Sequence, residues 1–401
     1  MGNRNLKFLQ HLLIYKKNTT FVNIFTEKQS NMNFYDIIVV GGGLSGATSA
    51  RLLAEKGYRV LVVEQKKHIA GQIFDYKDEH GISLHKYGPH IFHTKIKKVW
   101  DFVNRFTDFN HFQHSVLSFA EGDFIPFPIN RITLNKVFGE NLTTADVASF
   151  LQKEVRESTF NKDIVSFRDA VVSQVGERLY GLFFEEYTKK QWNCDPEELS
   201  PELAGRIPVR ENNDCRYFSD KYQGIPSKGY TEMVENMINH QNIHLLLGCD
   251  YNDVKDKFSS KLTVYTGELD RFFNYKFGKL AYRSVKMEFK TFEQEQFQQA
   301  PVVNYPNDYD FTRITEFKHL TGEKSPKTTV CFEYPSAEGL PFYTVPNKEN
   351  QYLREQYMQE VKQLEDTGNY LFIGRLAEYK YYNMDLAIES AIKRVSQWLE
   401  K

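Results

Sequence analysis

The chain has 401 residues, which at about 150 residues per domain predicts two or three domains with a sizeable buried core. Lys and Arg number 51 against 52 Asp and Glu, so the formal net charge is -1. This balance excludes a broadly basic nucleic-acid-binding protein and a strongly acidic disordered chain. Hydrophobic residues make up 41% and charged residues 26% of the chain, as is typical of globular proteins.

Membrane and metal-binding signals are missing from the sequence. No stretch approaches the roughly 20 consecutive apolar residues of a membrane-spanning helix. The cysteines are scattered, with no Cys-x-x-Cys pair: Cys194, Cys215, Cys249 and Cys331. Such a pattern is typical of reduced thiols in an intracellular protein and not of a disulfide framework or a zinc site. We therefore expect a cytoplasmic protein with no metal, no integral membrane association and no nucleic-acid partner.

The first 31 residues differ from the rest of the chain. They are rich in Lys and Arg, contain the single acid Glu27, and include a short apolar run from Phe8 to Tyr15. The run is short for a signal peptide and lacks a small-residue cleavage site. We expect residues 1–31 to form a poorly ordered N-terminal extension, with a short targeting or anchoring helix as the alternative. Met32, just before the first predicted strand, would make a natural start.

A strand, a glycine loop, a helix and an acid follow in order. Residues 35–40 form a β-branched apolar run that predicts a strand, and residues 41–46 (GGGLSG) match G-x-G-x-x-G. Apolar residues then recur at helical spacing from Leu44 up to Gly57. Residues 59–63 predict the next strand, which ends at Glu64. This order of elements predicts a dinucleotide-binding Rossmann-like unit.

Each feature of that unit has a physical role. Gly41 permits the tight turn, Gly43 lets the backbone approach a pyrophosphate, and Gly46 lets the helix pack closely on the strand. The N–H groups and dipole of the helix favour phosphate at its first residues, Leu44 and Ser45. Glu64 lies 18 residues beyond Gly46, where a carboxylate can accept hydrogen bonds from an adenosine ribose.

The segments after the acid and near the C-terminus favour FAD over NAD. Residues 65–72, beginning at Gln65 and including Gly71, resemble the segment that follows the acid in many two-domain flavoproteins. Residues 370–374 predict a strand and turn. Asn383 is a fitting N-cap for a helix whose apolar face runs from Ala387 to Leu399. In flavoproteins of this class a late helix points its N-terminus at the flavin, where its dipole stabilises an anionic reduced ring.

The middle of the chain predicts a helical region followed by an antiparallel sheet. A Thr143-x-x-Asp146 signature starts one helix, residues 167–192 predict another, and residues 114–127 predict a hairpin. Strands are also predicted at 261–267, 285–289, 302–303, 311–317 and 328–334. We expect a mixed α/β fold whose parts are a Rossmann-like FAD-binding domain (32–110, 222–271 and 366–401), a helical domain (132–205) and an antiparallel sheet domain (111–131, 206–221 and 272–365).

Longer motifs resemble the bacterial UDP-galactopyranose mutase family of FAD enzymes. The segments that carry the resemblance, in this order, are His85–Thr94, Tyr187–Trp192, Arg206–Arg210, Tyr217–Pro226, Tyr282–Ser284 and Gly374–Tyr382. The similarity runs from about Met32 to the C-terminus and is far more specific than the glycine loop.

The resemblance implies an isomerase that interconverts UDP-galactopyranose and UDP-galactofuranose for surface glycans of the cell wall and lipopolysaccharide. It implies that reduced FAD attacks the anomeric carbon through N5 and displaces UDP, with no net redox change. It also implies a homodimer. Reaction type, cofactor state and oligomer come from the family and not from composition or spacing.

The resemblance also assigns residues. Arg206 and Arg283 would neutralise the departing diphosphate, because the arginine fork binds phosphate oxygens bidentately, and His93 would lie beside the sugar. His90, Arg375, Asn383 and Met384 would contact the flavin. The residues implied for the substrate are Phe183, Tyr187, Thr188, Trp192, Tyr217, Phe218, Tyr343 and Tyr381. Read without the family, Phe183 is equally well a core residue, and His90 and His93 are structural histidines.

One departure and three alternatives stand beside this interpretation. Asn383 occupies a position where many members have an acid, so a proton-transfer role for that acid is in doubt here. A flavin-dependent oxidase or desaturase of the same fold is the first alternative. A mutase acting on a modified UDP-hexose is the second, and an inactive nucleotide-sugar-binding protein is the third.

Overall fold

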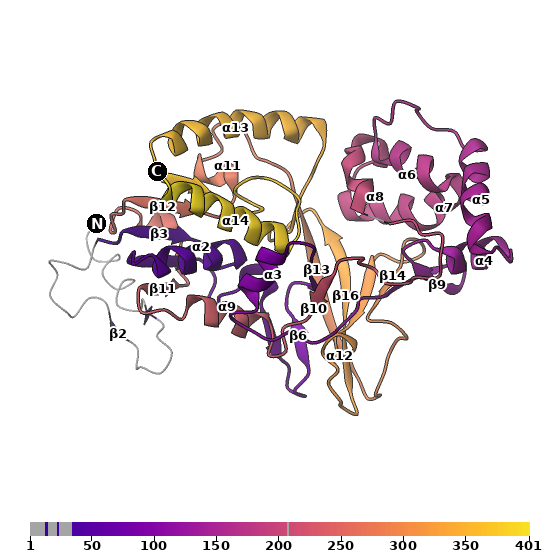
Figure 1. The fold of residues 1–401 in the computed structure, drawn as a ribbon, viewed down its shortest axis with the longest axis horizontal. Coiled ribbons are helices and arrows are strands. Elements are labelled where there is room, and N and C mark those ends of the chain that lie inside the picture. The colour runs from indigo at the N-terminus through magenta and orange to yellow at the C-terminus, as the bar shows by residue number, and fades with distance from the viewer. Residues whose placement is uncertain (1–12, 15–21, 24–33, 207) are drawn as a thin grey trace.

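The computed structural model describes residues 13–14, 22–23, 34–206 and 208–401, with residues 13–14, 22–23 and 206 described by their backbone alone. Figure 1 shows a Rossmann-like α/β region at one end, a cluster of helices at the other, and a second sheet between them. The predicted extension 1–31 lies largely outside the described residues. Its described pairs form β1 (Leu13–Ile14) and β2 (Val22–Asn23), which pair antiparallel at one edge of the Rossmann-like sheet.

The Rossmann-like sheet has the strand order β18-β12-β3-β4-β11-β1-β2. Its parallel strands are β3 (Ile37–Val40), β4 (Val60–Glu64), β11 (Ile243–Leu247), β12 (Leu262–Tyr265) and β18 (Tyr370–Phe372). Strands β3 and β4 are buried along their whole length, as expected for a parallel sheet covered on both faces. The predicted strands at 35–40, 59–63 and 261–267 are confirmed.

Helices from both ends of the chain cover this sheet. Helices α2 (Leu44–Glu55), α9 (Tyr230–Ile238) and α14 (Met384–Leu399) bury their apolar faces with Val39 and Val62. On the other face, α13 (Lys348–Asp366) packs Tyr357 and Val361 with Leu61. The helix predicted from Leu44 is confirmed as α2. Residues 348–365 were expected in the antiparallel sheet domain, and this part of the boundary is wrong because the apolar face of α13 covers the Rossmann-like sheet.

The second sheet has the strand order β17-β13-β16-β15-β14-β8-β9. Its strands are β8 (Val116–Ala120), β9 (Asp123–Phe127), β13 (Tyr282–Phe292), β14 (Val302–Asn304), β15 (Arg313–Glu316), β16 (Thr328–Ser336) and β17 (Tyr343–Thr344). The predicted hairpin at 114–127 is confirmed as β8–β9. The sheet is antiparallel except between β8 and β14, which run parallel.

The helical cluster holds α4 (Arg131–Phe138), α5 (Thr144–Arg156), α6 (Phe167–Val175), α7 (Glu177–Tyr180), a π-helical turn (Gly181–Glu185) and α8 (Glu186–Trp192). The predicted start of α5 is confirmed, because the backbone N–H of Thr143 donates to Asp146 at 2.7 Å. The single helix predicted over 167–192 is wrong. Gly176 adopts φ +82° and ends α6, and a Cβ there would lie 2.9 Å from Cβ of Glu154.

Short elements connect these layers. They are β5 (Asp75–Lys77), β6 (Ser83–His85), β7 (Phe92–Thr94), α3 (Lys97–Val103), β10 (Tyr222–Gly224), α10 (Tyr251–Val254), α11 (Leu269–Phe272) and α12 (Lys318–Thr321). Strands β7 and β10 pair with one another, so two motif segments far apart in the sequence lie side by side. None of the helices in the described part of the chain combines the length and apolarity needed to cross a bilayer.

Candidate active site

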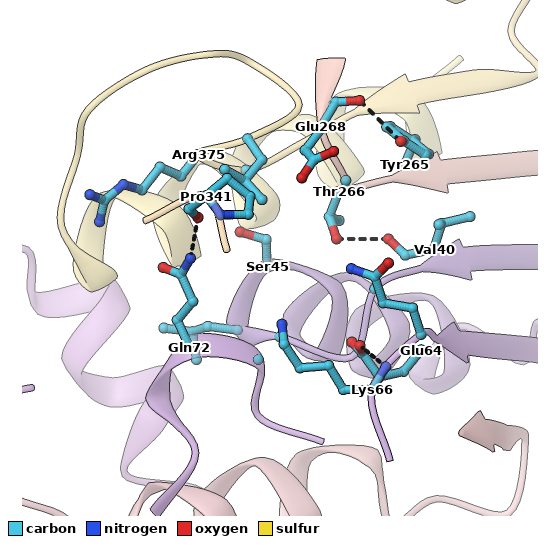
Figure 2. A pocket seen from close by; sticks show the side chains of 18 of the residues that line it. Val40, Ser45, Glu64, Lys66, Gln72, Tyr265, Thr266, Glu268, Pro341 and Arg375 are labelled. Carbon is cyan, nitrogen blue, oxygen red and sulfur yellow. Dashed lines mark hydrogen bonds between the residues drawn. The ribbon is translucent and has the colours of Figure 1, made fainter. Parts of the chain in front are cut away.

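A cavity of about 500 Å³ opens at the carboxyl ends of β3, β4 and β12 (Figure 2). Ligands of open α/β sheets bind at this edge. Segments far apart in the sequence form its walls: 40–45, 63–73, 249–255, 265–272, 339–341 and 370–387. The sequence-predicted cofactor residues that line it are Gly41, Gly43, Leu44, Ser45, Glu64, Gln65, Gly71, His90, Arg375, Asn383 and Met384.

The glycine turn is held by contacts that a larger residue would break. Gly41 has φ +107°, and a Cβ on Gly46 would lie 1.9 Å from the carbonyl oxygen of Gly41. Gly46 therefore lies beneath the turn instead of lining the cavity. Gly71 has φ +55°, and its Cβ would lie 3.0 Å from Cα of Gly43, so the two glycine segments touch at the cavity.

The side chain of Glu64 is fixed by the backbone around it. Its Oε2 accepts a hydrogen bond from the N–H of Gly42 at 2.7 Å, and its Oε1 accepts one from the N–H of Lys66 at 2.8 Å. Figure 2 shows the Lys66 contact at the cavity wall. Each carboxylate oxygen has two lone pairs, so both keep accepting capacity for a ribose hydroxyl.

His90 lines the cavity as a neutral ring. Its Nδ1 lies 2.8 Å from the carbonyl oxygen of Gly88, and because a carbonyl only accepts, this nitrogen carries the proton. Burial, together with the nearby His85 and Arg375, lowers the pKa of His90 to about 3. The free Nε2 of a neutral imidazole can accept a hydrogen bond from a ligand.

Arg375 brings an unsatisfied cation to the same wall. Its guanidinium lies 4.9 Å from the ring centre of Tyr343 and 4.7 Å from that of Tyr381. Its Nε and Nη2 are buried and have no hydrogen-bond partner among the described residues. Buried donors of this kind are normally paired, so Arg375 points to an anionic or carbonyl-bearing ligand.

Asn383 directly precedes α14, as predicted for its N-cap. Its side chain makes no capping hydrogen bond within the described part of the chain, so the expected cap contact is wrong. The amide instead lies 3.4 Å from Nε2 of His93. Asn383 thereby joins the cofactor wall to the residues expected around the sugar.

His93 is held from two sides. Its Nδ1 lies 2.7 Å from Oδ2 of Asp220, and its ring stacks on Phe218 with 3.6 Å between ring centres. Both rings were predicted from the sequence as site residues, but Asp220 was not. The signal was present, because Asp220 lies in the Tyr217–Pro226 motif, but its partner could not be identified before β7 and β10 were paired.

An aromatic cluster borders Arg375. Ring centres of Trp192 and Tyr381 are 5.7 Å apart, those of Trp192 and Tyr343 are 6.2 Å apart, and those of Tyr343 and Tyr381 are 5.6 Å apart. Burial raises the pKa of Tyr343 to about 12, so its phenol stays protonated and can donate. The structure thus brings together three predicted substrate residues that the sequence separates widely.

The remaining predicted substrate residues lie around this cluster. Tyr187 and Thr188 share α8 with Trp192, and burial raises the pKa of Tyr187 to about 12. Tyr217 packs edge-on against Phe218, with ring centres 5.0 Å apart. Phe183 is 4% exposed and belongs to the core of the helical cluster.

The structure describes the side chain of only one of the two arginines predicted to bind the diphosphate. Arg206 ends a short 3-10 helix (Pro201–Arg206), and its side chain lies outside the described part of the chain. Arg283 is 6% exposed. Its Nε donates to the carbonyl of Gln191 at 2.9 Å and its Nη2 to that of Lys190 at 3.3 Å. Arg283 therefore holds the end of α8 with part of its guanidinium.

Arg313 is a cation that the sequence analysis missed. Its Nε lies 2.8 Å from Oε2 of Glu333, which is 2% exposed, whereas Arg313 is 25% exposed. Burial opposes its charge, but Glu333, Tyr187 and Tyr343 hold the pKa of Arg313 above its ordinary value. It also acts electrostatically on His90. No motif marks this arginine, because its neighbours converge only through the pairing of β15 with β16.

Comparisons with known proteins find similarity over most of the chain. A family model described as UDP-galactopyranose mutase matches residues 182–381, and one for an NAD(P)-binding Rossmann-like domain matches residues 39–106. A dTDP-fucopyranose mutase of Escherichia coli is 37% identical over 368 residues, covering 89% of this chain and 96% of the relative. A probable UDP-galactopyranose mutase of Klebsiella pneumoniae is 34% identical over 374 residues, covering 92% and 96%.

Structural similarity gives the same fold. A crystal structure of reduced UDP-galactopyranose mutase superposes with a TM-score of 0.72 at 16% identity, covering 91% of this chain and 96% of that one. The resemblance drawn from the motifs is confirmed, as are the mixed α/β fold with its Rossmann-like domain and the assignment to the isomerases. The chain belongs to the UDP-galactopyranose mutase family.

Proposed function

We propose that this protein interconverts UDP-galactopyranose and UDP-galactofuranose and that it uses FAD as its cofactor. One observation carries the proposal: the dinucleotide cavity ends at Arg375, and the rings of Tyr343 and Tyr381 that flank Arg375 also contact Trp192. This end of the cofactor cavity lies beside phenols, an indole and the cation of Arg313. These groups suit a nucleotide diphosphate. An apolar substrate, as in the oxidase alternative, would need neither the cation nor the phenols.

The residues of the cavity fit FAD. A Cβ on Gly71 would lie 3.0 Å from Cα of Gly43, and this close packing of two glycines suits backbone approach to a pyrophosphate. Glu64 suits a ribose. At the other end the unpaired donors of Arg375 and the neutral His90 suit the carbonyl and ring nitrogen atoms of a flavin. When bound in its reduced form, FAD would supply a nucleophilic ring nitrogen for the anomeric carbon.

The residues of the chain would then bind and stabilise the leaving group. Trp192 and Tyr187 offer aromatic faces to the uracil ring. Arg313, Tyr343 and Tyr381 would donate to the diphosphate and stabilise the charge that grows as the glycosidic bond breaks. Arg206 and Arg283 remain proposed as further cations for the diphosphate. His93, oriented by Asp220, would contact the sugar together with Asn383.

The relative named dTDP-fucopyranose mutase supports a second candidate, dTDP-fucopyranose as the substrate. This nucleotide sugar has a methyl group on its base, lacks the ribose 2′-hydroxyl and lacks the sugar 6-hydroxyl. A modified UDP-hexose is a third substrate of the same class. All three leave a nucleoside diphosphate, so the cations and aromatic residues described above suit each of them.

The decisive experiment measures turnover with each nucleotide sugar. The purified protein is checked for bound flavin by its absorbance, reduced with dithionite, and supplied with UDP-galactofuranose or dTDP-fucofuranose, and the products are separated by chromatography. We expect conversion of UDP-galactofuranose only with reduced flavin. Faster conversion of the dTDP sugar would favour the second candidate, and hydrogen peroxide formed with an amine would favour an oxidase.

We also propose the cellular setting that the family resemblance implies. The product would supply galactofuranose for cell-wall and lipopolysaccharide glycans, and the protein would act in the cytoplasm as a homodimer. Sedimentation analysis tests the dimer, and loss of galactofuranose from surface glycans on gene deletion tests the role.

A further inference from the structure

Lys190 connects two parts of the site that the chain places far apart. It lies on α8, the helix that carries Tyr187 and Trp192. Its Nζ donates to the carbonyl oxygens of three residues of the loop between β14 and β15, namely Tyr305 at 2.6 Å, Tyr309 at 2.9 Å and Phe311 at 3.3 Å. These three acceptors match the three N–H donors of an ammonium group.

The loop that receives Lys190 leads directly to Arg313. Strand β15 begins at Arg313, immediately after the segment 305–312. The loop is stiffened by its own rings, since Tyr305 and Phe311 have ring centres 4.9 Å apart and Tyr309 and Phe311 have centres 5.0 Å apart. Movement of α8 relative to this loop would therefore change the distance from Trp192 to the Arg313 cation.

Two further residues, one on this loop and one on β13, hold α8 and the turn before it. Asn307 donates from its Nδ2 to the carbonyl of Leu182 at 3.2 Å, on the π-helical turn before α8. Arg283 donates to the carbonyls of Lys190 and Gln191 at the other end of α8. The turn before α8 and Lys190 are thus held by the loop between β14 and β15, and the end of α8 is held by β13.

We propose that Lys190 is a positioning residue that sets the distance between the base-binding helix α8 and the diphosphate-binding Arg313. The inference rests on the proposed function, because it assumes that a nucleoside diphosphate spans these two groups. Lys190 does not line the cofactor cavity, and its Nζ is directed at the loop carbonyls. Its contribution is the separation of two binding elements, so it should matter for ligands that engage both and not for ligands that engage one.

Three ligands separate this role from a merely structural one. Uridine engages the base site alone, inorganic pyrophosphate engages the cation site alone, and UDP engages both. In the holoenzyme, we expect Lys190→Met to weaken UDP binding roughly tenfold while uridine and pyrophosphate change by less than about twofold. Titration calorimetry measures all three dissociation constants. We expect KM for the nucleotide sugar to rise by about as much as the dissociation constant of UDP, and kcat to fall much less.

The neighbouring Lys189 provides a matched control. Its Nζ pairs only with Glu185 and Glu186 on its own helix among the described residues, at 2.9 and 2.8 Å. We expect Lys189→Met to leave all three ligand affinities unchanged. Lys190→Arg, which keeps the charge and several donors, should restore most of the UDP affinity.

A second variant guards against misfolding of Lys190→Met. Asn307→Ala removes the other loop contact, and we expect it to lower the ratio of UDP to uridine affinity by roughly threefold. Equal weakening of UDP and uridine, or unchanged UDP binding in both variants, would overturn the role of Lys190. If the unsubstituted holoenzyme failed to bind UDP, the proposed function itself would be wrong, and this inference with it.

Discussion

Arg313 and Glu333 face one another across β15 and β16, with Nε of the arginine 2.8 Å from Oε2 of the glutamate. The glutamate is 2% exposed, whereas the arginine is 25% exposed. Glu333 thus fixes the guanidinium from behind while part of Arg313 stays accessible. This geometry gives a cation that is already oriented before a diphosphate arrives, which lowers the cost of stabilising developing charge.

Substitution of Arg313 should lower both activity and stability, and a second substitution at Glu333 should restore stability alone. We expect Arg313→Gln to lower kcat/KM about a thousandfold through loss of leaving-group stabilisation. It should also destabilise the fold by roughly 3 kcal/mol, because Glu333 is left buried without its partner. The double variant Arg313→Met/Glu333→Met should recover stability in urea unfolding but not turnover.

Arg178 serves as the control for that experiment. Its Nη2 lies 2.7 Å from Oε1 of Glu121, and both side chains are about half exposed. We expect Arg178→Gln to leave both turnover and stability nearly unchanged, since exposed pairs contribute little. Full recovery of turnover in the Arg313/Glu333 double variant would contradict a role for Arg313 in the reaction.

A substitution at Gly71 tests whether the glycine contact at the cavity is needed for cofactor binding. We expect Gly71→Ala to lower the flavin bound per chain severalfold, because the new Cβ would lie 3.0 Å from Cα of Gly43 at a left-handed φ of +55°. The ratio of flavin to protein absorbance measures the loss. Gly81→Ala is the matched control, since Gly81 also has a left-handed φ, +77°, but no atom within 4 Å of a Cβ. An equal loss of flavin in the two variants would mean that backbone strain, and not the Gly43 contact, decides the outcome, and no loss in Gly71→Ala would contradict the prediction.

Buried histidines predict a loss of stability in acid. Burial lowers the pKa of His85 to about 4 and, together with Arg313 and His93, that of His114 to about 3, from an ordinary value of 6.5. Below pH 6.5 the unfolded chain takes up protons at these rings while the folded chain does not. The free energy of unfolding should therefore fall by about 1.4 kcal/mol per pH unit for each ring as the pH drops from 6.5 toward 4.

Urea unfolding at several pH values measures that slope. His114→Phe should remove the contribution of one ring to this slope, because phenylalanine cannot be protonated and keeps an aromatic ring beside Phe112 and Tyr217. The same slope in the variant and the unsubstituted protein would show that His114 is not a source of the acid sensitivity.

Asp220 should act through His93. We expect Asp220→Asn to lower kcat about tenfold with little change in flavin content, because the amide no longer favours one orientation and tautomer of the ring. Stopped-flow turnover of the reduced enzyme measures the change, and bound-flavin absorbance confirms that the cofactor site is intact. Unchanged kcat would exclude a positioning role for Asp220.

The Rossmann-like unit could be predicted because its determinants are local. The strand, Gly41, Gly46 and the acid Glu64 follow one another within a short stretch, and each has a direct structural reason. The aromatic and arginine residues of the motifs could be named only through resemblance to a family. Whether they meet in space depended on contacts between distant segments.

Features decided by long-range pairing could not be predicted. Arg313 is one arginine among many until β15 pairs with β16 and brings Glu333 opposite it. The contacts of Arg283 with the end of α8 depend on how the helical cluster docks, whereas its role at the diphosphate stays a prediction. The break at Gly176 did have a local signal, the glycine itself, which the helical periodicity of the flanking residues obscured.

The cofactor cavity draws its walls from both ends of the described chain, from Val40 to Ala387. A nascent polypeptide in which residues 374–387 have not yet left the ribosome lacks one wall of this cavity. We therefore expect a chain truncated before Gly374 to retain little flavin and to be purified without yellow colour.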